Sequence, residues 1–193
     1  MNNHEYPCEE ALHCYPDPDH NSNNTMLNCG KGNSLLLPLG GSSCGGGPKS
    51  RPPALVVGTV TLDTTGRNNS VVKLDFSNLI SYKATSHKGR LFLGIIFQLS
   101  KICNSGSKIP LGTWIFEKKA DSFDPVAFCC NSEGIGPDHG VVLVSDQAPF
   151  NFSWCECHTC PGCCTYILEI IDYDSAFIDF AAITNINFTA MAV

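Results

Sequence analysis

The sequence predicts an all-β fold, a jelly-roll-like antiparallel β-sandwich with an extended N-terminal arm. Three observations carry this prediction: apolar and polar residues alternate in many short runs, turn-forming residues separate these runs, and the spacing of an amphipathic helix hardly appears. Many short strands joined by regular turns are typical of a β-sandwich, and a jelly roll is the version that suits about 140 residues. With 193 residues, the chain is long enough for one such core and too short for two.

The strongest alternating pattern lies between Leu91 and Leu99, where every second residue is a large apolar one. Alternation of this kind places one face of a strand against a core and the other towards solvent. Strands are also expected in residues 56–62, 71–76, 111–117, 140–145, 149–155, 164–172 and 177–192. Turn-forming residues occupy 64–70, 87–89, 104–106, 131–134 and 136–137, which supports these strand boundaries.

Residues 1–50 differ in composition from residues 51–193, and we interpret them as an arm and hinge followed by the sandwich domain. Asn, Gly, Pro, Asp and Cys dominate the arm, and its apolar cluster is residues 34–39. Ordering such a segment costs about 1–2 kcal/mol per residue in backbone entropy, more than one apolar patch offsets. The arm is therefore expected to stay mobile unless strand pairing and disulfides hold it.

The leucine-rich segment of the arm has two interpretations, and the sequence leaves both open. As a strand donor, it would add to the sheet of the next subunit and link copies head to tail. Alternatively, it forms the first strand of its own sandwich. The candidate donor residues are Leu35, Leu36, Leu37 and Leu39. Pro38 restricts the segment to the edge of a sheet, because proline cannot donate a backbone hydrogen bond.

The charge pattern excludes several classes of partner. The net charge is −6 and there is no Lys/Arg cluster, so neither nucleic acid nor an anionic membrane surface is expected as a partner. No apolar run approaches the roughly 20 residues that span a bilayer, so membrane insertion is not expected either. The histidines are scattered and no catalytic set stands out, so the chain is not expected to be an enzyme.

The segment CECHTCPGCC, residues 155–164, contains the densest group of cysteines. Pairs of cysteines separated by two residues are typical of zinc sites. The candidate ligands would be Cys155, Cys157, His158, Cys160, Cys163 and Cys164. However, the two pairs here share Cys160, whereas a structural zinc site usually draws its pairs from separate segments. We therefore favour no metal or cofactor, and zinc remains the alternative.

Disulfide cross-links are the favoured interpretation of these cysteines. Successive side chains of a strand point to opposite faces, so Cys163 and Cys164 are expected to face opposite ways, as are Cys129 and Cys130. One cysteine of each pair can then face inward and the other outward, which suits links between layers or between subunits.

The same alternation predicts that Cys155 and Cys157 share one face. Their separation would lie near the outer limit for a disulfide, about 6.8 Å between Cα atoms, so each is expected to find a partner elsewhere. The pair Pro161-Gly162 predicts a tight hairpin turn between the strand that ends near Cys157 and the strand that follows.

Four segments of the expected strands resemble a known family. They are VTLDTTG at 60–66, FQLSKIC at 97–103, IPLGTW at 109–114 and CPGCCTY at 160–166. On these motifs, residues 28–193 resemble a cysteine-rich domain-of-unknown-function family of spore-forming anaerobic bacteria. The resemblance implies a setting: the outer layers and appendages of spores often consist of disulfide-linked β-proteins that are made without a signal sequence.

The twelve cysteines indicate an oxidising destination. The N-terminal sequence lacks the basic start and apolar run of a secretory signal. We therefore expect an extracellular or spore-surface location that is reached without a signal peptide. The candidate cross-linking residues are Cys8, Cys14, Cys29, Cys44, Cys129, Cys130, Cys155, Cys157, Cys160, Cys163 and Cys164, whereas Cys103 fits either an internal or a linking role.

Together these features predict a structural, self-assembling subunit of an extracellular or spore-surface fibre or layer. Its main partner would be itself, in a head-to-tail homopolymer joined by strand addition and disulfides. The alternatives are a zinc module in the cysteine-rich segment and a carbohydrate-binding surface domain, with surface glycans or other coat proteins as partners. The aromatic platform for a sugar would be Trp114, Phe150, Phe152 and Trp154, although packing in a core accounts for these residues better.

Overall fold

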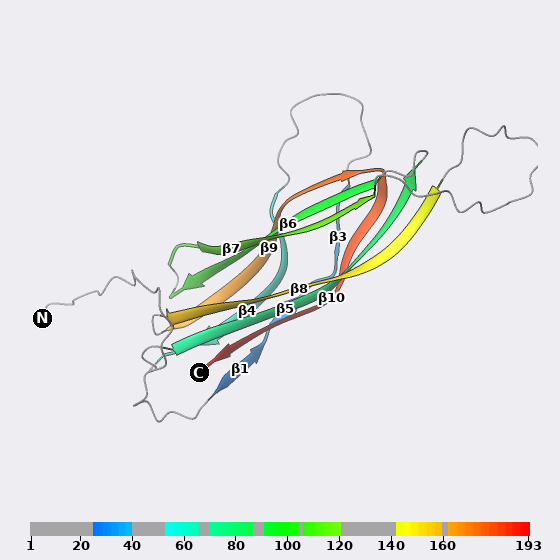
Figure 1. The fold of residues 1–193 in the computed structure, drawn as a ribbon. Coiled ribbons are helices and arrows are strands. Elements are labelled where there is room, and N and C mark those ends of the chain that lie inside the picture. The colour runs from blue at the N-terminus through cyan, green and yellow to red at the C-terminus, as the bar shows by residue number, and fades with distance from the viewer. Residues whose placement is uncertain are drawn as a thin grey trace, which may run out of the picture.

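The computed structural model shows two antiparallel β-sheets packed face to face, which confirms the predicted all-β sandwich (Figure 1). It describes residues 25–39, 53–65, 70–86, 91–104, 106–120, 142–159 and 162–193, and within these ranges every regular element is a strand. In the same ranges, no helix is long and apolar enough to cross a membrane.

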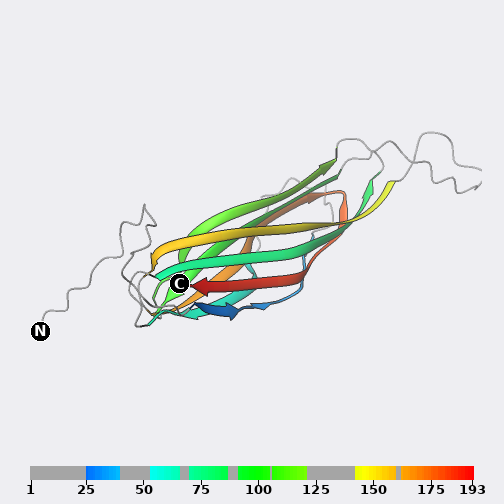
Figure 2. The same ribbon diagram turned by 60° about the horizontal axis from the view of Figure 1, so that its bottom comes forward.

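Each sheet contains five strands. Sheet A consists of β1 (Met26–Cys29), β3 (Leu35–Leu36), β5 (Ser70–Ser86), β8 (Val142–Thr159) and β10 (Ile178–Ala192). Its order is β1-β10-β5-β8, with β3 also beside β10, and Figure 2 shows β8, β5, β10 and β1 side by side in this arrangement. Sheet B consists of β2 (Lys31–Gly32), β4 (Leu55–Asp63), β6 (Leu91–Cys103), β7 (Ile109–Ala120) and β9 (Cys163–Ala176), in the order β2-β4-β9-β6-β7.

The connections between the long strands give the sandwich its jelly-roll-like character. From β4 to β10, every step along the chain except β6 to β7 passes from one sheet to the other. Strands that are distant in sequence therefore become neighbours, as when β9 pairs with both β4 and β6. Alternating wrapping of this kind is typical of a jelly roll.

The core lies between the sheets and follows the alternation seen in the sequence. On β6, the residues from Leu91 to Leu99 alternate between buried and half-buried positions, and Leu93, Ile95 and Phe97 are fully buried. On β5, the inward face includes Leu74, which is also fully buried. Burial of each such side chain stabilises the fold by about 1.5–3 kcal/mol.

The N-terminal segment closes one lateral side of the sandwich. It pairs with β10 as β1, crosses to β4 as β2, and returns to β10 as β3. Gly30 lies at the first crossing, where its amide donates to the carbonyl of Phe188 (2.7 Å). A β-carbon at this position would overlap the carbonyl oxygen of Thr59 and lie 2.9 Å from that of Phe188, so the crossing requires glycine.

Part of the expected arm therefore lies in the sandwich of its own chain. Leu35 and Leu36 are opposite Ile183 and Ala182 on β10. Leu37 is buried, and its amide donates to the carbonyl of Ala181 (2.9 Å). In this structure the leucine-rich segment forms an edge of its own sheet.

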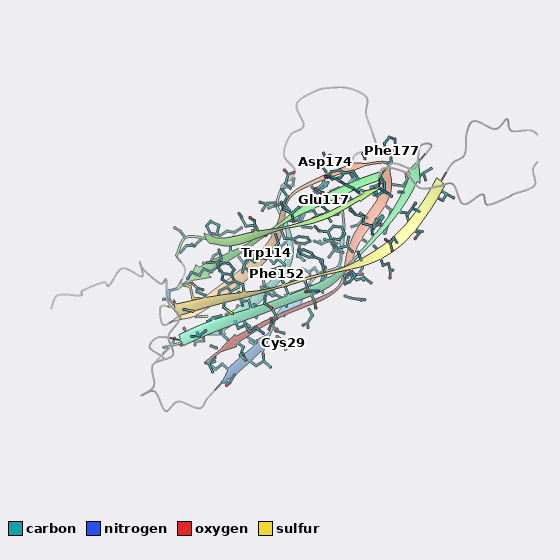
Figure 3. All side chains as sticks on the ribbon, viewed as in Figure 1. Cys29, Trp114, Glu117, Phe152, Asp174 and Phe177 are labelled. Atoms are coloured by element: carbon teal, nitrogen blue, oxygen red, sulfur yellow. A yellow bond between two sulfur atoms is a disulfide. The ribbon has the colours of Figure 1, made fainter. Side chains whose placement is uncertain are left out.

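Side chains close the opposite lateral side, where the edge strands β7 and β8 face each other across the sandwich. We call this contact the aromatic seam; it consists of Trp114, Phe116, Phe150, Phe152 and Trp154. The ring of Trp114 stacks on that of Phe152 with centroids 3.8 Å apart, and Figure 3 shows the two residues together between β7 and β8. One face of Trp114 is thus covered by another ring.

We predict that Phe152→Ala lowers the free energy of unfolding by about 3–5 kcal/mol, because it leaves a cavity at the centre of the seam. The matched control is Ile115→Ala on β7, whose side chain is 65% exposed, and we expect a loss below about 1 kcal/mol. Urea unfolding of the monomer measures both values. Equal losses in the two variants would contradict a structural role for the seam.

Candidate functional site

The cysteine-rich end of the sandwich is the candidate functional site. It lies where β6 and β8 end and β9 begins. Cys103 on β6 and Cys164 on β9 are directly opposite each other in adjacent strands of sheet B. They form a disulfide with a Cα–Cα distance of 4.0 Å, across a sequence separation of 61 residues. The sequence allowed either an internal or a linking role for Cys103, and the structure shows the internal one.

Cys163 faces the opposite way from Cys164, as the alternation predicted. Cys163 is exposed and free, whereas Cys164 is buried against the core. Just before them, Gly162 has a φ of 142°, in a region that favours glycine. Its carbonyl accepts hydrogen bonds from the amide and the hydroxyl of Thr64 (2.9 and 3.1 Å).

The expectation of a hairpin at Pro161-Gly162 is wrong in one respect. β8 belongs to sheet A and β9 to sheet B, so the connection between them passes from one sheet to the other. Its far end is held by Asn104, whose side-chain oxygen accepts a hydrogen bond from the amide of Cys163 (3.2 Å). Gly162 lies in a bend as expected, but β8 and β9 are not hydrogen-bonded neighbours.

The expectation that Cys155 and Cys157 share a face stays a prediction, but the two residues differ in exposure. Cys155 is exposed, whereas Cys157 is buried and disulfide-bonded. The register of β8 against β5 shifts between the pairs Ser70/Thr159 and Val72/Glu156. A bulge of this kind inserts an extra residue, so the simple alternation of faces does not extend beyond Glu156.

Three of the described cysteines are free and exposed: Cys29 on β1, Cys155 on β8 and Cys163 on β9. Cys29 and Cys155 lie on opposite edge strands of sheet A, with β10 and β5 between them. Three strand spacings separate them by about 14 Å, whereas a disulfide requires Cα atoms within about 7 Å. They therefore cannot bond to each other within one folded chain.

The remaining candidate cysteines cannot be placed. Cys8, Cys14, Cys44, Cys129, Cys130 and Cys160 lie outside the described residues, and so does the side chain of His158. Within the described ranges, no group of three or more His, Cys, Asp or Glu side chains could hold a metal ion. Of the proposed zinc ligands, Cys164 is bonded to Cys103, and Cys157 is also in a disulfide.

Two polar clusters flank the aromatic seam, and sequence reasoning missed both. In the first, the hydroxyl of Tyr82 donates to Asp146 Oδ2 (2.8 Å), and Lys118 Nζ lies 3.3 Å from the same oxygen. The hydrogen bond from Tyr82 is the main reason that the pKa of Asp146 lies below its usual 3.8. Burial, followed by the contact with Asp146, raises the pKa of Tyr82.

The second cluster joins three strands near the cysteines. Lys101 on β6 forms an ion pair with Glu156 on β8, and Glu156 also accepts a hydrogen bond from the hydroxyl of Tyr166 (3.3 Å). Burial is the main cause of the raised pKa of Tyr166. Polar residues at inward positions of alternating strands could have indicated these clusters. The sequence does not show which residues pair, because that depends on which strands face each other. Both clusters connect the two sheets on the side of β8.

A family model described as "Domain of unknown function (DUF4489)" matches residues 23–193. The chain belongs to the DUF4489 family. The match includes all ten strands of the sandwich, β1 and β2 among them. No curated protein and no solved structure matches the chain significantly. The DUF4489 domain is thus the whole described sandwich, together with the N-terminal segment that closes its side.

We predict that the double substitution Cys103→Ser and Cys164→Ser lowers the free energy of unfolding by about 2–4 kcal/mol, because the disulfide restricts the unfolded chain. Urea unfolding without reductant, after alkylation of the exposed thiols, measures the loss. Cys163→Ser is the matched control, because Cys163 is next to Cys164 and forms no disulfide. This substitution should change the free energy of unfolding by less than about 0.5 kcal/mol. No difference between the double variant and the control would show that the bond is dispensable.

Proposed function

We propose that this DUF4489 domain is a structural, self-assembling subunit of an extracellular or spore-surface fibre or layer. The observation that carries the proposal is the set of exposed thiols at Cys29, Cys155 and Cys163. They lie on three different strands of a domain that also contains disulfides. Cys29 and Cys155 cannot reach each other within the chain, so these exposed thiols are suited to bonds between chains.

The linking chemistry needs an oxidant, and dioxygen is sufficient. Two thiols lose two protons and two electrons as one sulfur–sulfur bond forms, and dioxygen accepts both to become hydrogen peroxide. Disulfides of this kind persist outside the cell and on its surface, where no thiol system reduces them. The internal bond between the half-buried Cys103 and the buried Cys164 supports an oxidising destination, because disulfides form and persist in oxidising surroundings.

Backbone pairing would supply the non-covalent part of the contact. The leucine-rich segment already pairs with β10 of its own chain, so strand addition would use the edges that remain. In the described part of the chain, β7 and β8 border one lateral side and the short strands β1, β2 and β3 the other. Unpaired edge strands are templates for pairing with another chain.

The proposed location follows from family and chemistry together. The motifs resemble a family of spore-forming anaerobic bacteria, and the outer layers of spores are a setting for cross-linked β-proteins. The candidate sugar platform is packed into the aromatic seam, and two of the candidate zinc ligands, Cys157 and Cys164, are in disulfides. The described structure therefore favours assembly over the two alternative functions.

The test is electrophoresis of the full chain after purification in reductant and exposure to air. We expect a ladder of covalent multimers without reductant that collapses to one monomer band when reductant is added. Alkylation of the thiols before air exposure is the control and should leave only monomer. A single monomer band after complete air oxidation would contradict the proposal.

A further inference from the structure

We infer that copies of this chain join edge to edge through sheet A, with β1 of one copy beside β8 of the next and a disulfide between Cys29 and Cys155. The inference rests on the proposed function and identifies the surfaces that it would use. Four features of the sandwich support it: two free edges of one sheet, compatible strand directions, two thiols at nearly the same level, and an internal bond of the same kind.

The two edges are compatible in direction. Within the described residues, β1 pairs with β10 alone and β8 pairs with β5 alone, so each has one unpaired edge. All three strand pairings across sheet A are antiparallel. β1 and β8 of one chain therefore run in opposite directions. A second copy in the same orientation would place its β1 antiparallel to β8 of the first, and sheet A would continue across the contact.

The two thiols lie at nearly the same level along the strands. Cys29 is opposite Thr189, which is opposite Asp75, which is opposite Ser153 on β8. Cys155 is therefore two residues further along β8 than the level of Cys29. A shift of about 7 Å along the strand aligns them and keeps both on the outer face, because side chains repeat every second residue.

Aligned in this way, the two cysteines would have the geometry of a cross-strand disulfide. Directly opposed residues of antiparallel strands have Cα atoms about 4.5–5.5 Å apart, within the range that a disulfide spans. The sandwich already contains a bond of this kind, since Cys103 and Cys164 are opposed on adjacent strands with a Cα–Cα distance of 4.0 Å. The proposed link repeats this arrangement between two chains.

The edges have room for the added strand. Proline cannot donate to a neighbouring strand, and the proline of β8, Pro149, lies six residues from Cys155. β1 contains no proline. Leu27 is 68% exposed on the outer face of β1, two residues from Cys29, and a neighbouring copy would partly cover it. The end of β8 that carries Cys155 is thus the favourable part of this edge.

The contact joins different surfaces of the two copies. An assembly of any length therefore has an unbonded Cys29 at one end and an unbonded Cys155 at the other. Each copy would contribute Cys29 on one side and Cys155 on the other, and addition continues unless the ring closes. Formation of each link oxidises two thiols and reduces dioxygen to hydrogen peroxide, as above. Cys163 lies on sheet B and takes no part in this contact.

Two complementary full-length variants test the link. Of the two linking thiols, Cys29→Ser retains only that of β8 and Cys155→Ser only that of β1. Both sites are exposed, so circular dichroism should show an unchanged fold. We expect each variant alone to lose the covalent ladder in air. For the mixing experiment, one of the two variants carries a size tag. Their mixture should form a covalent dimer of one tagged and one untagged chain. Cys163→Ser is the control and should retain the ladder.

The outcomes separate this inference from the proposed function. If the unaltered chain forms no ladder, the proposed function fails. If it forms a ladder that both single variants retain, assembly stands and the link between Cys29 and Cys155 is wrong. A covalent dimer of Cys155→Ser alone would show a bond between two copies of Cys29 and would also overturn the inference. Mass spectrometry of digested multimers, mixed from light and heavy isotope-labelled chains, should find the two cysteine peptides joined across chains.

Discussion

The width of sheet A determines what the exposed thiols of this protein can do. Cys29 and Cys155 occupy the same face of one sheet, but two strands lie between the strands that carry them. The separation of about 14 Å is twice the reach of a disulfide. By contrast, Cys103 and Cys164 are on adjacent strands and are bonded. The same type of side chain is thus structural in one position and available to a second molecule in the other.

The two lateral sides of the sandwich are closed in different ways. On one side, the N-terminal segment crosses between the sheets at Gly30 and pairs with both β10 and β4. On the other side, the stacked rings of Trp114 and Phe152 join β7 and β8. Polar clusters around Asp146 and Glu156 flank this seam. Each side is fixed firmly enough to present its edge strand to a neighbour.

The parts of the fold that depend on local pattern could be predicted from the sequence. The alternation from Leu91 to Leu99 predicted a buried strand, and Gly162 predicted a turn. The opposite orientation of Cys163 and Cys164 also followed, because it requires only an extended backbone.

The parts that depend on strand order could not be predicted. The bond between Cys103 and Cys164 requires β6 and β9 to be neighbours, which no local pattern specifies. The bulge between Glu156 and Thr159 arises from the register of β8 against β5. The hairpin expected at Gly162 was wrong for the same reason, since local turn residues do not indicate which sheet the next strand joins.

Cryo-electron microscopy of oxidised assemblies is the most direct test of edge-to-edge cross-linking. This account predicts that sheet A continues from one copy to the next, with β1 about 4.8 Å from β8 of its neighbour. It also predicts density for a sulfur–sulfur bond between Cys29 and Cys155. Assemblies in which the edges of sheet A face solvent, and in which both of these thiols remain unbonded, would contradict it.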